Sequence, residues 1–130
     1  MNEDMPEKYA NSPPVFSAPV RNERGAPVVE VHGEIDLATI SELLEAIGRA
    51  GSRMDGLPIM FVDLRNADFI DVYGVRNLVD QALAMRRFEG ELRLIVPGEG
   101  PVARAFELLG IGQVLDLYHE LDLSANGRAS

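Results

Sequence analysis

Three aspartates fall close together in one stretch of the chain, Phe61–Leu78. Asp63 closes an apolar run, and Asp68 and Asp71 follow it. Carboxylates on a loop can hold a hard cation, and a carboxylate just ahead of a helix can cap that helix. We expect no metal here, because Asp63, near a strand end, is placed to satisfy backbone groups. Asp71 has the position of a helix N-cap.

The residues around these aspartates predict a strand, an acidic turn and a helix. Residues 57–64 form an almost unbroken apolar run, which is typical of a strand covered on both faces. Apolar residues then recur at helical spacing, at Val75, Leu78, Val79 and Ala82. We therefore expect Asp71–Gly74 at an exposed helix N-terminus, where free N–H groups and the helix dipole favour anions.

A second strand is also expected to be followed by an aspartate and a helix. Val28–Ile35 is rich in β-branched residues, and Asp36 follows it directly. Open α/β folds place their binding sites at the carboxyl ends of the strands. We expect Asp36 and Asp71 to share one such rim. The simpler interpretation is that each is only an N-cap, which contributes about 1 kcal/mol.

The motif Phe69-Ile-Asp-x-x-Gly-Val-x-x-Leu78, after a strand that ends Val62-Asp-Leu64, resembles the STAS domain of bacterial anti-sigma factor antagonists. Val31-His-Gly-Glu-Ile-Asp36 matches a second turn of that family, and the resemblance covers roughly residues 28–123. It implies an α/β fold, STAS-like, with a mixed sheet of roughly four to five strands. About three to four helices should pack mainly on one side of that sheet.

In the antagonists, the residue after the motif aspartate is a Ser or Thr that the anti-sigma factor, a small Ser/Thr kinase, phosphorylates. The kinase releases its sigma factor when it captures the unphosphorylated antagonist. Val72 holds that position here and has no hydroxyl. One interpretation is an antagonist held permanently in the partner-binding state. The alternative is a non-signalling STAS module, either a subunit of a transport assembly or a sensor of a small ligand or nucleotide.

Tyr73 carries a hydroxyl one residue later, but its oxygen lies too far from the backbone for a Ser/Thr kinase, so we expect a recognition contact there. The resemblance implies an anti-sigma factor, a Ser/Thr kinase-like protein, as the partner. Through this partner the chain would affect the activity of a sigma factor and so transcription. The chain itself is expected to be a monomer or weak dimer and to bind no cofactor. The expected partner-binding residues are Asp36, Asp71, Val72, Tyr73, Gly74 and Arg76.

Composition excludes several other classes of protein. The chain has 130 residues, which suits one domain, and its net charge of −9 disfavours nucleic acid and anionic membranes as direct partners. It has no apolar run near the length of a membrane span and no secretory signal, so we expect a cytoplasmic protein without membrane insertion. The absence of cysteine rules out disulfides and thiol switches.

The sequence does not suggest an enzyme. It lacks a Gly-x-x-x-x-Gly-Lys loop, a Gly-x-Ser-x-Gly elbow and a His-Glu-x-x-His motif. His32 and His119 are the only imidazoles; we expect the first on a sheet face and the second in a late surface turn. The glycine-rich segment Pro97–Gly100 lacks a lysine and is expected to be a turn.

The rest of the chain supplies the elements that would position this rim. Strands are expected over residues 15–20, 28–35, 57–64, 92–96 and 113–118, with a turn over 21–27 that makes a hairpin. The second of these strands should carry Glu30 and His32 on one face, and Gly33 should mark a bulge or a close backbone approach. Helices are expected to end near Gly51, Gly90 and Gly110, with a helical turn over 119–123.

The first helix should begin at Asp36 or Thr39, and Thr39 and Glu42 fit a capping box. The third helix should begin near Pro101. Residues 1–14 are expected to be a mobile tail, 15–123 the STAS domain, and 124–130 a frayed end.

Overall fold

The computed structural model describes residues 15–54 and 58–124. Its central sheet has the strand order β1-β2-β4-β6. β1 pairs antiparallel with β2, whereas β2 and β6 both run parallel to β4, so the sheet is mixed as expected. The strands are β1 (Val20–Glu23), β2 (Ala26–Glu30), β4 (Ile59–Asp63) and β6 (Glu91–Ile95).

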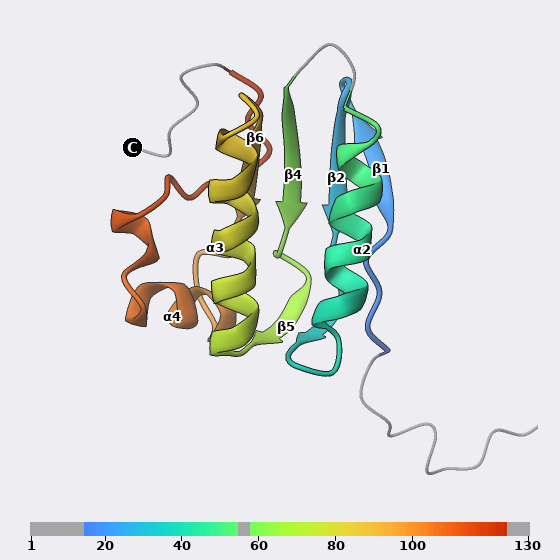
Figure 1. The fold of residues 1–130 in the computed structure, drawn as a ribbon. Helices are drawn as coiled ribbons and strands as arrows, with labels where there is room; N and C mark the ends of the chain where they lie inside the picture. The colour runs from blue at the N-terminus through green and yellow to red at the C-terminus, as the bar shows by residue number, and fades with distance from the viewer. Residues whose placement is uncertain (1–14, 55–57, 125–130) are drawn as a thin grey trace, which may run out of the picture.

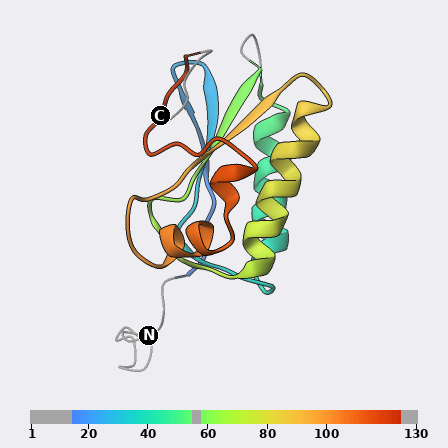
Figure 2. The same cartoon turned by 90° about the vertical axis from the view of Figure 1, so that its left-hand side faces the viewer.

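A second, two-stranded sheet is formed by β3 (Gly33–Ile35) and β5 (Ala67–Ile70), which pair in parallel. Two long helices, α2 (Ile40–Gly51) and α3 (Val72–Arg86), lie side by side over one face of the central sheet (Figures 1 and 2). Two shorter helices follow β6: α4 (Pro101–Leu108) and the 3-10 helix η1 (Ile111–Gln113). The α/β class and the mixed sheet with its long helices on one side are therefore confirmed.

Both faces of the central sheet are covered, and this explains the apolar run in β4. The larger core lies between the sheet and the helices and includes Val62, Leu78 and Phe106. On the other face, a smaller apolar cluster lies under Leu121 and Leu123 of the C-terminal segment. All five residues of β4 are consequently buried. Residue 57, the first of the expected strand, is outside the described residues.

The N-terminal hairpin forms, but its turn is shorter than predicted. β1 continues to Glu23, and only Arg24 and Gly25 make the turn, with φ of 52° and 93°. Two consecutive residues with positive φ are typical of the tight hairpin turn that suits the twist of the strands. Of the strand expected over 15–20, only Val20 lies in β1, and Ser17 makes a single bridge with His32, so that prediction was wrong in extent.

The strand expected over 28–35 is broken into β2 and β3. The register shifts between Gly33 and Glu34, and Gly33 has a φ of 94°. A Cβ on Gly33 would lie 3.0 Å from the Cα of Phe16. Both the bulge and the close backbone approach expected at this glycine are thus present.

The predictions for the C-terminal segment were wrong. Residues 113–118 form no strand, because η1 occupies their start and only one bridge, from Ile95 to Tyr118, joins the segment to β6. Residues 119–123 form no helical turn. Two backbone hydrogen bonds at Tyr118 hold the segment to the end of β6, and side-chain contacts add to them. The buried guanidinium of Arg93 donates to the Asp122 carbonyl and lies 5.0 Å from the Tyr118 ring centroid.

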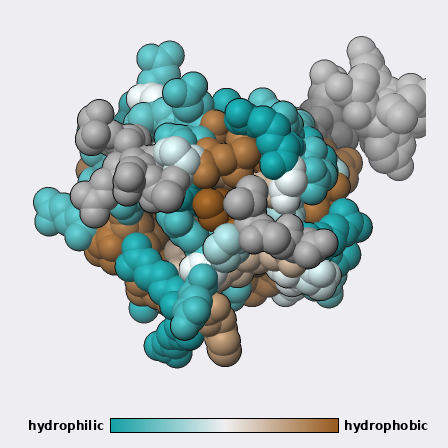
Figure 3. Space-filling model, turned by 90° about the horizontal axis from the view of Figure 1, so that it is seen from above, coloured by the Kyte–Doolittle hydropathy of each residue, from teal (hydrophilic) through white to brown (hydrophobic). Residues whose placement is uncertain are grey.

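The end of the molecule at which α2 and α3 finish has an apolar hollow. At the end where α2 and α3 finish, Met54, Met85 and Phe88 line a hollow of about 290 Å3. Figure 3 views this end and shows apolar surface between polar margins. α2 and α3 begin at the opposite end (Figure 1). Over the described parts of the chain, no helix has the length and apolar content that a membrane crossing requires.

Candidate functional site

The pairing of β3 with β5 brings the two aspartate loops together. Ile35 lies opposite Ile70 in the register, and the N–H of Asp71 donates to the Ile35 carbonyl at 3.0 Å. Asp36 and Asp71 each follow one member of this residue pair. The structure therefore places them on one rim, at the end of the molecule where both long helices begin.

Sequence reasoning missed β5, although this strand sets the geometry of the rim. Its residues, Ala67–Ile70, show no apolar alternation, and Asp68 and Phe69 are exposed. Only Ile70 is buried in this strand. A strand this short is stabilised by its partner β3 and by packing, so its own residues give little periodic signal.

Asp71 caps α3, as predicted. Its Oδ1 accepts from the N–H of Gly74 at 2.9 Å, which satisfies one of the free donors at the helix start. The carboxylate also places negative charge at the positive end of the helix dipole. The Asp71 carboxylate thus already takes the place that a bound anion would have at this helix start.

Asp36 organises the loop before α2 in a related way. Its Oδ1 accepts from the N–H groups of Ala38 and Thr39 at 3.0 and 3.2 Å. The Thr39 hydroxyl donates to the Glu34 carbonyl at 2.7 Å and makes no cap bond to α2. The prediction of a capping box formed by Thr39 and Glu42 is therefore wrong, because the Thr39 hydroxyl bonds to the loop before the helix and not to the helix N–H groups.

Apolar side chains surround the two loops and face solvent. Four large ones are exposed: Leu37 (71%), Phe69 (44%), Val72 (47%) and Tyr73 (53%). Leu37 and Phe69 were not predicted as exposed: Leu37 follows Asp36 in the loop after β3, and Phe69 follows Asp68 within β5. We call these four residues together with Asp36, Asp71 and Arg76 the rim surface. Arg76 is exposed on the next turn of α3.

Gly74 lies beneath the rim surface instead of on it. It is buried, and a Cβ there would lie 2.7 Å from Cγ1 of Ile70 and 2.8 Å from Cγ2 of Ile35. The glycine therefore allows α3 to approach the β3–β5 pair closely. The first turn of α3, which carries Val72 and Tyr73, is therefore packed directly against β3 and β5.

The third aspartate of the motif, Asp63, points to the other face of the sheet. Its carboxylate accepts from Nε and Nη2 of Arg65 at 2.9 and 2.8 Å and from the Arg65 N–H at 3.0 Å. Burial alone would raise the pKa of Asp63, but the bonds from Arg65 outweigh it and lower that pKa. Asp63 therefore accepts a hydrogen bond from a backbone N–H, as predicted, and also forms an ion pair with the Arg65 guanidinium.

The described residues contain no group of three His, Cys, Asp or Glu side chains arranged to hold a metal ion. Asp63, Asp68 and Asp71 are thus not brought together as ligands. His32 lies 2.7 Å from Glu30 through its Nε2, so these two residues share a sheet face, as predicted. The contact with His32, opposed by burial and aided by Arg21, lowers the pKa of Glu30.

Comparison with known proteins agrees with this geometry. The family model for the STAS domain matches residues 17–123. The anti-sigma-B factor antagonist of Staphylococcus aureus (strain NCTC 8325 / PS 47) is 29% identical over 87 residues, which are 67% of this chain and 78% of that protein. An anti-sigma factor antagonist from Mycobacterium paratuberculosis has a similar structure, with a TM-score of 0.67 and 28% identity over 83% of this chain and 89% of that one.

The antagonist SpoIIAA in its unphosphorylated form has the same fold, with a TM-score of 0.58 at 19% identity over 76% of this chain and 84% of that one. Because the family model spans most of the chain, the class is settled: this chain belongs to the STAS domain family. The similar proteins from Staphylococcus aureus and Mycobacterium paratuberculosis are named anti-sigma factor antagonists.

Proposed function

We propose that this protein is an anti-sigma factor antagonist that binds an anti-sigma factor through the rim surface and so frees a sigma factor. The observation that carries the proposal is the exposure of Leu37, Phe69, Val72 and Tyr73 around two adjacent helix starts. Grouped exposed apolar side chains with a polar margin are typical of protein-binding surfaces. Names given to proteins at 28% and 29% identity support the same role.

Aspartates give this apolar surface its charge. Asp36 and Asp71 lie on the rim, and the whole chain carries a net charge of −9. A partner surface with basic residues would be attracted to it and oriented by it. Phosphorylation of the rim would add further negative charge beside these two carboxylates, which disfavours a docked partner by repulsion and by the cost of burying the charge.

Val72 makes that modification impossible at its own position. The side chain is 47% exposed at the first position of α3, so a kinase could reach it, but it has a methyl where Thr has a hydroxyl. The proposed partner, a Ser/Thr kinase-like anti-sigma factor in the cytoplasm, would therefore find no phosphoacceptor. The rim surface then stays in its binding form.

Titration of a purified anti-sigma factor with Val72→Glu tests the binding surface. A buried, unpaired carboxylate costs several kcal/mol, so we expect binding at least roughly 100-fold weaker than for the unchanged protein. Val114→Glu is the matched control, because Val114 is 51% exposed but lies outside the rim surface. Far-UV circular dichroism should be the same for both variants. Equal affinity of the two variants would place the interface elsewhere.

Val72→Thr tests the lost phosphoacceptor. Incubation of the anti-sigma factor with radiolabelled Mg-ATP should label this variant and leave the unchanged protein unlabelled. Tyr73 is the internal control, because its hydroxyl is present in both proteins. Stoichiometric label on any residue of this loop in the unchanged protein would contradict the proposal.

A further inference from the structure

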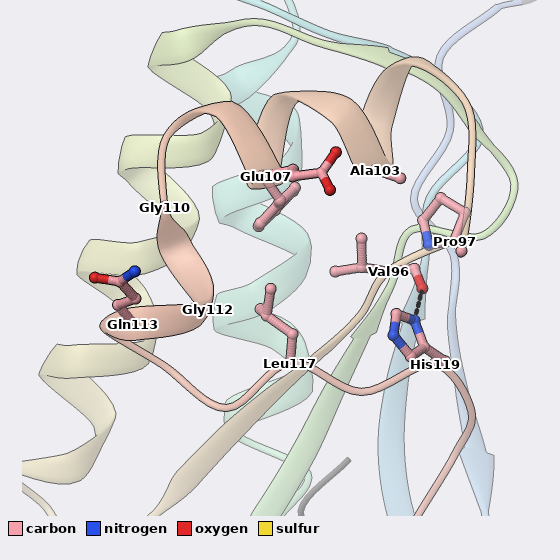
Figure 4. Close-up of a pocket in the computed structure, with 11 residues that line it drawn as sticks. Val96, Pro97, Ala103, Glu107, Gly110, Gly112, Gln113, Leu117 and His119 are labelled. Atoms are coloured by element: carbon pink, nitrogen blue, oxygen red, sulfur yellow. Dashed lines mark hydrogen bonds between the residues drawn. The ribbon is translucent and has the colours of Figure 1, made fainter. Parts of the chain in front are cut away.

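A second cavity, lined by none of the rim-surface residues, lies at the carboxyl end of β6. It has a volume of about 440 Å3, within the range of small-molecule sites. The loop after β6 forms one wall, and α4 with the turn into η1 forms another (Figure 4). Its apolar lining residues are Val96, Pro97, Ala103, Phe106 and Leu117.

Three glycines, the amide of Gln113 and two ionisable side chains form the rest of the lining. Glu107 extends its carboxylate from α4, and His119 approaches from the C-terminal segment on the opposite wall (Figure 4). No lysine or arginine is among the described residues that line the cavity. The acidic side chain in the lining is therefore not matched by a lysine or arginine of the same cavity.

The hydrogen bond of His119 determines what its ring can offer. Its Nδ1 lies 2.9 Å from the Val96 carbonyl oxygen. A carbonyl oxygen only accepts, so Nδ1 carries the hydrogen, and the neutral ring keeps Nε2 as an acceptor. Nε2 lies on the cavity side of the ring (Figure 4), and no described residue bonds to it. Both ionisable side chains thus present acceptors, and the amide of Gln113, which also lines the cavity, offers an acceptor and a donor.

We propose that this cavity binds a small organic cation: an ammonium or amidinium group on an apolar body. The body would lie against Phe106 and Leu117, and the N–H donors would bond to Glu107 and Nε2 of His119. A nucleotide or another anion is disfavoured, because the only fixed charge in the lining is negative. The residues of this site are not those of the rim surface, so the site adds a ligand-binding capacity to the proposed regulator.

Three aromatic probes of similar size test the charge preference: benzamidine, benzyl alcohol and benzoate. Each is titrated into the full 15N-labelled chain and followed by amide chemical shifts. Benzamidine should give saturable shifts at residues of the cavity, benzyl alcohol should bind at least about tenfold more weakly, and benzoate should not bind. Equal binding of benzoate, or benzamidine shifts that do not saturate or lie elsewhere, would overturn the proposal.

Glu107→Gln tests the carboxylate without changing its shape. Benzamidine should bind about five- to tenfold more weakly to this variant, because an exposed ion pair is lost. Glu45→Gln is the matched control, since Glu45 is an exposed carboxylate on α2 outside the cavity. Unchanged affinity in the Glu107 variant, with its amide spectrum intact, would also overturn the proposal.

Discussion

Because α3 lies very close to the β3–β5 pair, we predict that Gly74→Ala lowers the free energy of unfolding, although the same change normally stabilises a helix. Gly74 is the third residue of α3 and is buried. The added Cβ would lie 2.7 Å from Cγ1 of Ile70 and 2.8 Å from Cγ2 of Ile35, both closer than a Cβ can normally approach. Ile35 and Ile70 are themselves packed in the core, so they can move little.

Two opposing effects determine the magnitude. Replacing glycine by alanine inside a helix normally stabilises a protein by about 1 kcal/mol. Overpacking of a dense core costs about 1 to 3 kcal/mol, so Gly74→Ala should lower the free energy of unfolding by up to about 2 kcal/mol. Gly48 provides the matched control inside α2, because a Cβ there meets nothing within 4 Å. Gly48→Ala should raise the free energy of unfolding by about 1 kcal/mol.

Urea denaturation followed by circular dichroism measures both variants. The difference between them should be about 1 to 3 kcal/mol, which is the cost of the close approach alone. The slope of the free energy against urea should not change. If Gly74→Ala gained as much stability as Gly48→Ala, the contact with Ile35 and Ile70 would not constrain the helix, and the reasoning would be refuted.

The ion pair of Asp63 predicts a pH dependence. Its pKa is lowered in the fold, so its stabilisation is complete above the unfolded pKa of about 4 and is lost as pH falls through the folded value. Asp63→Asn should unfold more easily at pH 7 and lose less stability on acidification than the unchanged protein; exposed Asp68→Asn should do neither. In the hairpin turn, Arg24 has a φ of 52° ahead of Gly25, so Arg24→Asn should raise the free energy of unfolding by about 0.5 to 1 kcal/mol, and a loss in urea titration would contradict this.

The parts of the fold that were predictable are those where one residue pattern determines the structure. The apolar run of β4 and the helical spacing of α3 each reflect burial on known faces, and both elements are present. Asp71 was predictable as a cap because the geometry of a helix start is local. The closeness of Asp36 and Asp71 depended on strand pairing, which the sequence only implied.

The parts that sequence reasoning missed depend on contacts between distant residues. β5 exists through its pairing with β3, and the C-terminal segment is shaped by the buried Arg93 about thirty residues before it. Neither leaves a periodic pattern in its own residues. The exposure of Leu37 and Phe69 was missed for a related reason, since apolar residues are normally assigned to the core until the packing around them is known.

The most direct test of the rim surface is calorimetric titration of the anti-sigma factor with the unchanged protein, Val72→Thr and Val72→Glu. The account predicts that the unchanged protein and Val72→Thr bind with similar affinity, because their shapes match. Val72→Glu should bind at least roughly 100-fold more weakly. If Val72→Glu bound as tightly as the unchanged protein, the partner would dock elsewhere, and the central claim would be contradicted.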